Sequence, residues 1–168
     1  MKFSFRLLAS ILLLSILGGC GDSSTSPSSN VSPVAMTIPS GWTRQDNTTS
    51  SGSQQQYTLT SPTGTGIVMA LTTPRSSMSA DQVIQLELAA YQSQYVGMVV
   101  DSNLTRSVAG YQARILEFHM IESGTTVTER EVVFQTAAND VQVLFTRLTS
   151  DTATAATMLG MESQIRIQ

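Results

Sequence analysis

Two side chains carry chemistry that no other residue of this chain duplicates: the only histidine, His119, and the only cysteine, Cys20. A histidine can act as the general base for a serine nucleophile, but such catalysis also needs a positioned partner and a cleft. In the segment RILEFHM, His119 alternates with Ile115 and Glu117, as on one face of a strand. We therefore expect a structural histidine beside a local carboxylate and no catalytic residue. A hydrolase that uses His119 is the alternative.

The other motifs do not supply a metal or cofactor site. Zinc needs three or four histidine, cysteine or carboxylate ligands, which one histidine and one cysteine do not provide. The sequence has no calcium loop of alternating acids. The segment TGTG (63–66) lacks the Gly-Lys-Ser/Thr and the strand-to-helix setting of a phosphate-binding loop. We expect no metal and no cofactor.

Cys20 follows a segment typical of an export signal. Lys2 and Arg6 precede eleven apolar or small residues, LLASILLLSIL (7–17). As a helix this run spans roughly 16 Å, about half of the ~30 Å hydrocarbon core of a membrane. Residues 1–19 are therefore expected to be a signal peptide and not a stable transmembrane helix.

The segment Leu17-Gly18-Gly19-Cys20 resembles the lipobox of bacterial lipoproteins. The resemblance implies that the Cys20 thiol is joined to diacylglycerol, that cleavage follows Gly19, and that the new amino terminus is acylated, for example with palmitate. Because two or more acyl chains anchor a protein stably, the mature chain is expected on a membrane surface of the cell envelope. A plain signal peptide before an incidental cysteine is the alternative.

Residues 20–35 are expected to tether a single domain, residues 36–168, to that membrane. Residues 21–35 (GDSSTSPSSNVSPVA) hold six serines and two prolines, and as a flexible coil they reach roughly 20 Å. Gly21 stands where enteric-type sorting places an acidic residue for inner-membrane retention. This favours the outer membrane, facing the periplasm, over the inner membrane.

Composition indicates one globular domain that does not bind nucleic acid. The chain has 168 residues, 41% hydrophobic and 12% charged, which suits a single core. Loss of Lys2 and Arg6 with the signal peptide takes the formal charge from −3 to −5, and the seven remaining arginines are scattered. Nucleic-acid binding needs clustered positive charge.

Capping and alternation patterns predict an α+β domain. A capping box of Ser79 and Gln82 predicts one helix, and Asp151 begins a second that runs to about Glu162. The buried stripe of the first helix is expected to be Ile84, Leu88, Tyr91 and Tyr95. Strands are expected at AMTI, GWTRQ, QQYTLTS, GIVMALTT, ARILEFHM, TTVTEREVVFQT, DVQVLFTRLT and IRI. The order of strands, helix, strands, helix indicates a mostly antiparallel sheet flanked by helices.

Two local expectations concern packing. A three-residue loop at 138–140 would place Glu131 opposite Arg147 and avoid the like charges that a turn at Ala138 and Asn139 would oppose. Trp42 is expected to be largely buried and to anchor the first strand.

This layout resembles a broad family that includes PsbP-type photosystem proteins, Mog-type Ran-binding proteins and DcrB-like bacterial lipoproteins. The matching segments are IPSGW (38–42), LTSP (59–62), VAGYQA (108–113) and the closing helix followed by IRI. The resemblance covers residues 36–168. It implies an α/β/α sandwich, and members that bind other proteins without a shared catalytic centre. Metal-ligand histidines of some PsbP-type proteins have no counterpart here.

Three functions are consistent with these features. The favoured one is a membrane-anchored, non-catalytic module that binds or helps to assemble an unidentified envelope protein. The alternatives are the envelope hydrolase using His119 and a structural surface lipoprotein without a discrete partner.

Overall fold

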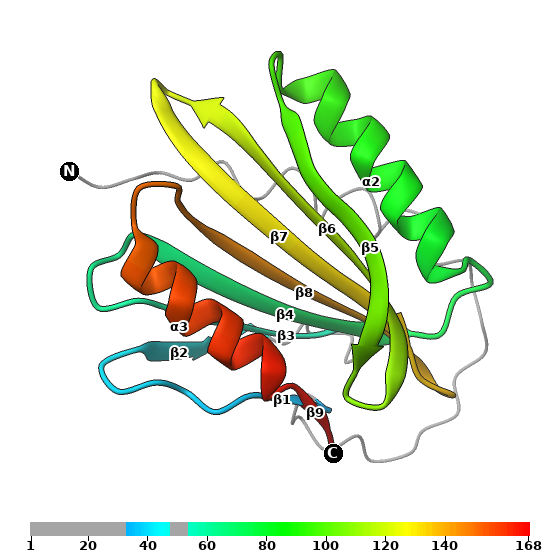
Figure 1. Cartoon of the computed structure of the whole chain (residues 1–168). Coiled ribbons are helices and arrows are strands. Elements are labelled where there is room, and N and C mark those ends of the chain that lie inside the picture. The colour runs from blue at the N-terminus through cyan, green and yellow to red at the C-terminus, as the bar shows by residue number, and fades with distance from the viewer. Residues whose placement is uncertain (1–32, 48–53) are drawn as a thin grey trace.

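The computed structural model describes residues 33–47 and 54–168 as an antiparallel sheet with one helix on each face (Figure 1). The strands of the sheet are β2 (Thr43–Asp46), β3 (Gln55–Thr60), β4 (Gly66–Pro74), β5 (Val99–Val108), β6 (Tyr111–Glu122), β7 (Thr125–Gln135) and β8 (Asn139–Leu148). Their spatial order is β2-β3-β4-β8-β7-β6-β5. The helices are α2 (Ala80–Gln94) and α3 (Thr152–Ser163). The expected α+β class is confirmed.

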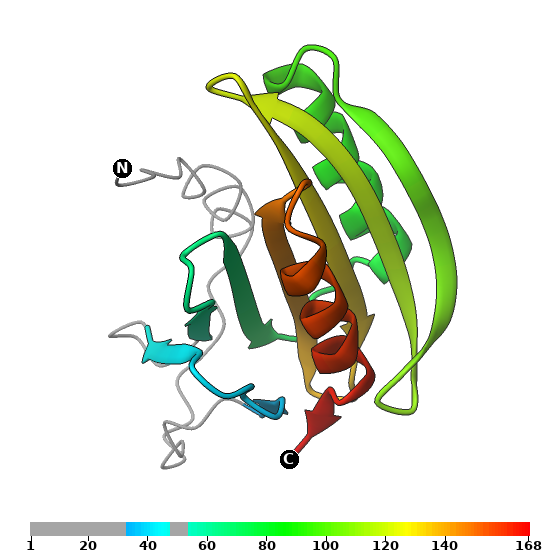
Figure 2. The same cartoon turned by 60° about the vertical axis from the view of Figure 1, so that its left-hand side comes forward.

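The two faces of the sheet build two separate cores, because successive side chains of a strand point to opposite faces. Figure 2 shows α2 and α3 on opposite sides of the sheet. Under α3 lies a core that includes Leu59, Val68, Ile115, Val132, Phe134, Val143, Met158 and Met161. Under α2 lies a smaller core of Val83, Ile84, Tyr91, Leu116, Phe118, Met120 and Val133. Each such side chain contributes about 1.5 to 3 kcal/mol when fully buried.

Both helices begin where the sequence predicts. The Ser79 hydroxyl accepts from the Gln82 N–H at 3.2 Å, and the Gln82 side chain accepts from the Ser79 N–H at 2.8 Å. The Asp151 carboxylate accepts from the Thr154 N–H at 3.0 Å and begins α3. In the expected stripe of α2, Ile84 and Tyr91 are buried, and Leu88 and Tyr95 are partly buried.

Strand β5 is absent from the sequence-based expectation. Its residues are mostly exposed along the whole strand, so they show no apolar alternation. Conversely, the first expected strand, AMTI, contributes only its first residue to β1 (Val34–Ala35). β1 pairs with β9 (Arg166–Ile167), with Val34 opposite Ile167, in a two-stranded ribbon just beyond the C-terminal end of α3. The expected closing strand is therefore present.

The expected β7–β8 register is wrong. Arg147 lies opposite Thr128, and Glu131 lies opposite Leu144. The turn residues are Ala137 and Ala138, because the Thr136 hydroxyl accepts from the N–H groups of Ala138 and Asn139 at 3.3 and 2.9 Å. This side-chain bond fixes a shorter turn than the loop inferred from charge pairing.

Trp42 is partly buried and packs against the edge of the α3-side core, so the expectation of a largely buried anchor is too strong. Its N–H donates to the Pro39 carbonyl at 3.1 Å. This bond closes the turn that leads into β2. The strand itself is exposed at all of its residues. Trp42 and the guanidinium of Arg44, which lies over the buried Tyr57 ring, both join this edge of the sheet to the core.

Candidate functional site

Five segments meet at the N-terminal end of α2 and form a polar cleft of about 330 Å³. They are the β4–α2 connection, the first turn of α2, and the strands β5, β6 and β7. The lining residues are Arg75, Ser79, Ala80, Asp81, Thr105, Gln112, Arg114 and Gln135. Two guanidinium groups, two side-chain amides and two hydroxyl groups therefore face one volume. The groups are suited to hydrogen-bonding a polar ligand or protein segment.

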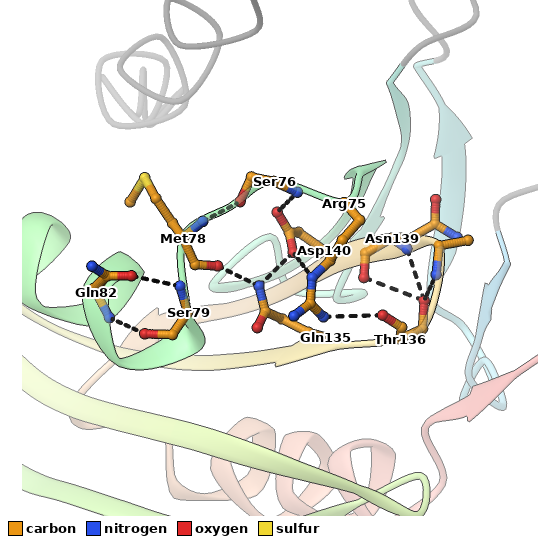
Figure 3. Close-up of polar contacts among 10 residues, drawn as sticks. Arg75, Ser76, Met78, Ser79, Gln82, Gln135, Thr136, Asn139 and Asp140 are labelled. Atoms are coloured by element: carbon orange, nitrogen blue, oxygen red, sulfur yellow. Dashed lines mark hydrogen bonds and ion pairs between the residues drawn. The ribbon is translucent and has the colours of Figure 1, made fainter.

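The first turn of α2 adds backbone donors to the cleft. The capping box satisfies the N–H groups of Ser79 and Gln82 (Figure 3). Ala80 and Asp81 stand at the first two helical positions, where an N–H has no partner within the helix. The positive end of the helix dipole therefore adds to the two arginines, and the Asp81 carboxylate offsets part of that charge.

Asp140 and Gln135 hold one wall of the cleft in place (Figure 3). The Asp140 carboxylate accepts from the Ser76 N–H at 2.8 Å and from Gln135 Nε2 at 2.7 Å. Gln135 Nε2 also donates to the Met78 carbonyl at 2.5 Å. These bonds join the β4–α2 connection to the ends of β7 and β8, so the start of α2 is tied to the sheet.

Arg75 extends the same network. Its Nη1 donates to the Thr136 carbonyl at 3.0 Å, and its Nε lies 3.8 Å from Asp140 Oδ1. Its own N–H donates to the Ala138 carbonyl at 2.9 Å. Arg75 therefore links the cleft to the β7–β8 turn, while part of its side chain stays exposed.

Arg114 forms the opposite wall. Its Nη1 donates to Asp81 Oδ1 at 2.6 Å, and its Nη2 donates to Asn103 Oδ1 on β5. Among the described residues, the Arg114 Nε is buried without a hydrogen-bond partner. A guanidinium group has hydrogen-bond donors and no acceptor, so Arg114 is suited to binding an acceptor group of a ligand.

The surroundings of His119 are separate from those of the cleft. It is on the α3 side of β6, where its Nδ1 is 2.9 Å from both carboxylate oxygens of Asp101. Glu117, the local carboxylate that the sequence offered, instead binds Arg130 Nη1. His119 does not line the cleft or the small cavity between α2 and β4, β7 and β8.

Arg130 is the centre of an ion-pair network over the α3-side face. Its Nε donates to Glu162 Oε2 on α3 at 2.6 Å, and Glu162 also pairs with Arg106 on β5. Glu117 lies directly opposite Arg130 on β6. The arginine of the TEREVV segment thus pairs with glutamates on β6 and α3. Glu131 does not pair with Arg147 on β8 as the sequence suggested.

The two glutamates that flank Arg130 point to the other face. Glu129 and Glu131 are buried beneath α2 together with Glu87. Gln142 Nε2 donates to Glu87 Oε1 at 2.6 Å and also to Glu131 Oε1. The sequence-based expectations did not include this buried group of glutamates, although the period-2 alternation of TEREVV places both Glu129 and Glu131 on the face opposite Arg130.

Burial raises the pKa values of two of these carboxyl groups, Glu129 and Glu87. It raises the pKa of Glu129 to about 8, with smaller contributions from the nearby Glu131 and Glu122 carboxylates. Burial also raises the pKa of Glu87 well above its ordinary value, and the neighbouring Glu131 adds to the effect. Within residues 33–47 and 54–168, no cluster of three or more His, Cys, Asp or Glu side chains could hold a metal ion.

The expected lipidation site, Cys20, lies outside the described residues. Among the residues that the structure does describe, no helix is long and apolar enough to cross a membrane.

No protein-family model and no curated protein matches the chain. Solved structures do resemble it. The cyanobacterial PsbP (CyanoP) of Synechocystis sp. PCC 6803 aligns with a TM-score of 0.61 at 12% identity, over 91% of this chain and 99% of that chain. The T6SS immunity protein TplEi of Pseudomonas aeruginosa gives 0.55 at 11% identity, over 68% and 44%. A Bacteroides thetaiotaomicron protein gives 0.54 at 15%, over 80% and 45%. The chain therefore has a PsbP-like fold.

Proposed function

We propose that this chain is a lipid-anchored protein of the cell envelope that binds a partner protein without catalysing a reaction. The proposal has two parts: an anchor at Cys20 with its tether, residues 20–35, and a binding domain, residues 36–168. The lipobox and the preceding apolar run support the anchor. Gly21 supports the outer membrane, facing the periplasm, as the destination.

The polar cleft at the start of α2 carries the binding part of the proposal. Two arginines, Gln112 and the N–H groups of the first helical turn present donors to one open volume. The Nε2 group of Gln135 is already bonded to Met78 and Asp140, so Gln135 offers its side-chain oxygen as an acceptor. A network that ties α2 to β7 and β8 holds these donors in place, so little conformational entropy is lost when a partner binds. Such a surface suits backbone carbonyls, carboxylates or side-chain amides of a protein segment.

The surroundings of His119 support a non-catalytic role. Its Nδ1 contacts the Asp101 carboxylate on the α3 side of the sheet, and the cleft lies on the α2 side. A histidine–carboxylate pair needs a nucleophile and a substrate cleft for covalent catalysis. In this proposal His119 stabilises the β5–β6 pair.

The test is photocrosslinking in the native envelope with a benzophenone amino acid at Gln112, which lines the cleft and is exposed. Gln92, exposed on the outer surface of α2, is the matched control position. We expect one discrete adduct from position 112 and none from position 92. The Arg114→Ala substitution should remove that adduct, and Arg166→Ala, an exposed arginine near the C-terminus, should retain it.

Two results would contradict the proposal. Equal, diffuse adducts at both positions would indicate a structural surface protein without a discrete partner. Loss of the adduct and of complementation in a folded His119→Ala variant would favour the hydrolase. We expect that variant to complement a deletion strain normally.

A further inference from the structure

Strand β5 presents an open edge of the sheet. It is the last strand in the spatial order, and in the described part of the chain no element pairs with its outer side (Figure 2). An edge strand offers a row of backbone N–H and C=O groups that can pair with another strand. The other edge, β2, is four residues long, whereas β5 has ten. β5 is therefore the better template for strand addition.

A β-bulge gives this edge an unusual arrangement of charge. The register of β5 on β6 shifts between Val100 and Ser102, so Asp101 is the extra residue. Asp101 contacts His119, and Arg106 contacts Glu162, which places both charges on the α3-side face. Leu104 lies between them opposite the core residue Ile115, and 39% of it is exposed.

We propose that a second copy of this chain pairs with β5 in antiparallel orientation, about a two-fold axis at Leu104. In this register Leu104 lies opposite Leu104 of the second copy, and Ser102 lies opposite its Arg106. Arg106 of each copy then lies beside Asp101 of the other. The same strand thus supplies both members of two symmetric charge pairs and an apolar pair at the axis, which makes the edge complementary to itself.

On the α2 side of the paired strands, this register brings the clefts of the two copies close together. In the same register Asn103 lies opposite Thr105 of the second copy. Thr105 lines the polar cleft, and the side-chain Oδ1 of Asn103 accepts a hydrogen bond from Arg114, which also lines it. Both clefts therefore open beside the two-fold axis. That the pair binds a partner across both clefts rests on the binding function proposed above. The pairing itself rests only on the proposed anchor, which brings the copies together on one membrane.

The bulge also limits the pairing. Beyond Ser102 the extra residue interrupts the ladder, so regular pairing covers residues 102–106 of each copy. An interface of this size is weak in dilute solution. Confinement of both copies to one membrane surface raises their effective concentration, so we expect the pair in the envelope and not in dilute extracts.

Cysteine crosslinking tests the register directly. Leu104→Cys is introduced into the full chain, and envelopes are treated with an oxidant before electrophoresis without reductant. Residues that face each other across antiparallel strands have Cα atoms about 4.5 to 5.5 Å apart, within the range of a disulfide. We expect a reductant-sensitive band at twice the monomer mass. Ser102→Cys is the matched control, because its two copies would lie roughly 13 Å apart along the strands.

A charge variant tests the second half of the proposal. Asp101→Arg in the Leu104→Cys chain places like charges beside each other at both ends, and we expect at least a fivefold loss of the dimer band. Asp101→Asn, which keeps a polar side chain beside His119, should lower the band by less than twofold. Unchanged thermal melting of the solubilised chains confirms that both variants are folded.

The proposal is overturned if Leu104→Cys gives no dimer band, if Ser102→Cys gives an equal band, or if Asp101→Arg leaves the band unchanged. These outcomes are independent of the adduct at Gln112. A dimer band without that adduct leaves the pairing standing and removes the proposed partner binding. The adduct without a dimer band leaves the proposed partner binding standing and removes the pairing.

Discussion

A buried carboxyl group beneath α2 makes the stability of the folded domain depend on pH. Glu129 is 3% exposed, and the Tyr91 hydroxyl donates to its carboxyl group. In the unfolded chain a glutamate has a pKa near 4.5, whereas in the folded domain the pKa of Glu129 is about 8. Above pH 4.5 the unfolded chain therefore releases a proton that the folded domain keeps.

This difference predicts a loss of stability as pH rises. The contribution of Glu129 is fully present below pH 4.5 and is lost between pH 4.5 and about 8, which amounts to roughly 5 kcal/mol. Glu129→Gln removes the titrating group and keeps its shape. We expect the variant to be more stable than the parent at pH 8 and to show a flatter dependence on pH.

Urea denaturation between pH 5 and 8 measures this effect. Asp46→Asn, which removes an exposed carboxylate on β2, is the control and should leave the slope with pH unchanged. An equal slope for the parent and Glu129→Gln would contradict the prediction.

At the scale of elements, the contact between α3 and β4 depends on the absence of a side chain at Gly66. A Cβ atom there would lie 2.4 Å from Thr154 Cγ2 and 2.9 Å from Met158 Cε, both on α3. Gly66→Ala should therefore push α3 from the sheet and lower the free energy of unfolding by about 1 to 3 kcal/mol.

The denaturation midpoint is the measurement, and Gly160→Ala is the control. Gly160 lies within α3, and a Cβ atom there meets nothing within 4 Å. Because alanine favours a helix over glycine, Gly160→Ala should raise stability by up to about 1 kcal/mol. Opposite signs for the two substitutions are expected, and a neutral Gly66→Ala would contradict close α3–β4 packing.

The elements that the sequence predicts are those with a local chemical signal. Ser79, Gln82 and Asp151 cap helices through their own side chains, so their positions follow from residue type. β5 has no such signal, because its position depends on β6 and most of its side chains are exposed. The prediction of the β7–β8 register is wrong for a related reason. The register is set by the Thr136 hydroxyl in the turn, and not by the charges along the strands.

Except for the residues of its helix cap, the candidate cleft could not be predicted from the sequence. Its residues come from the β4–α2 connection, α2 and three strands, and Thr105 belongs to the strand that was missed. Arg75 and Arg114 are 39 residues apart in the sequence. Only the sheet order brings them to one volume, and no local pattern encodes that order.

At the scale of the whole molecule, the proposed anchor at Cys20 would determine where the domain acts. Cys20→Ser removes the thiol that lipidation of the lipobox cysteine uses. We expect the variant to accumulate as an uncleaved precursor without fatty-acid label. Metabolic labelling followed by electrophoresis measures both effects. Continued incorporation of label in the variant would contradict the lipoprotein assignment.

The ribbon of β1 and β9 gives the domain a defined response to mechanical force. Gln168 N–H donates to the Pro33 carbonyl at 2.8 Å, so both ends of the domain lie side by side at one end of the sheet (Figure 1). A pull on the segment before Pro33 is applied first to a two-residue strand and to the buried Val34. Because each strand of this ribbon has only two residues, we expect it to separate under tension before the seven-stranded sheet does, which would leave the cleft and the β5 edge intact.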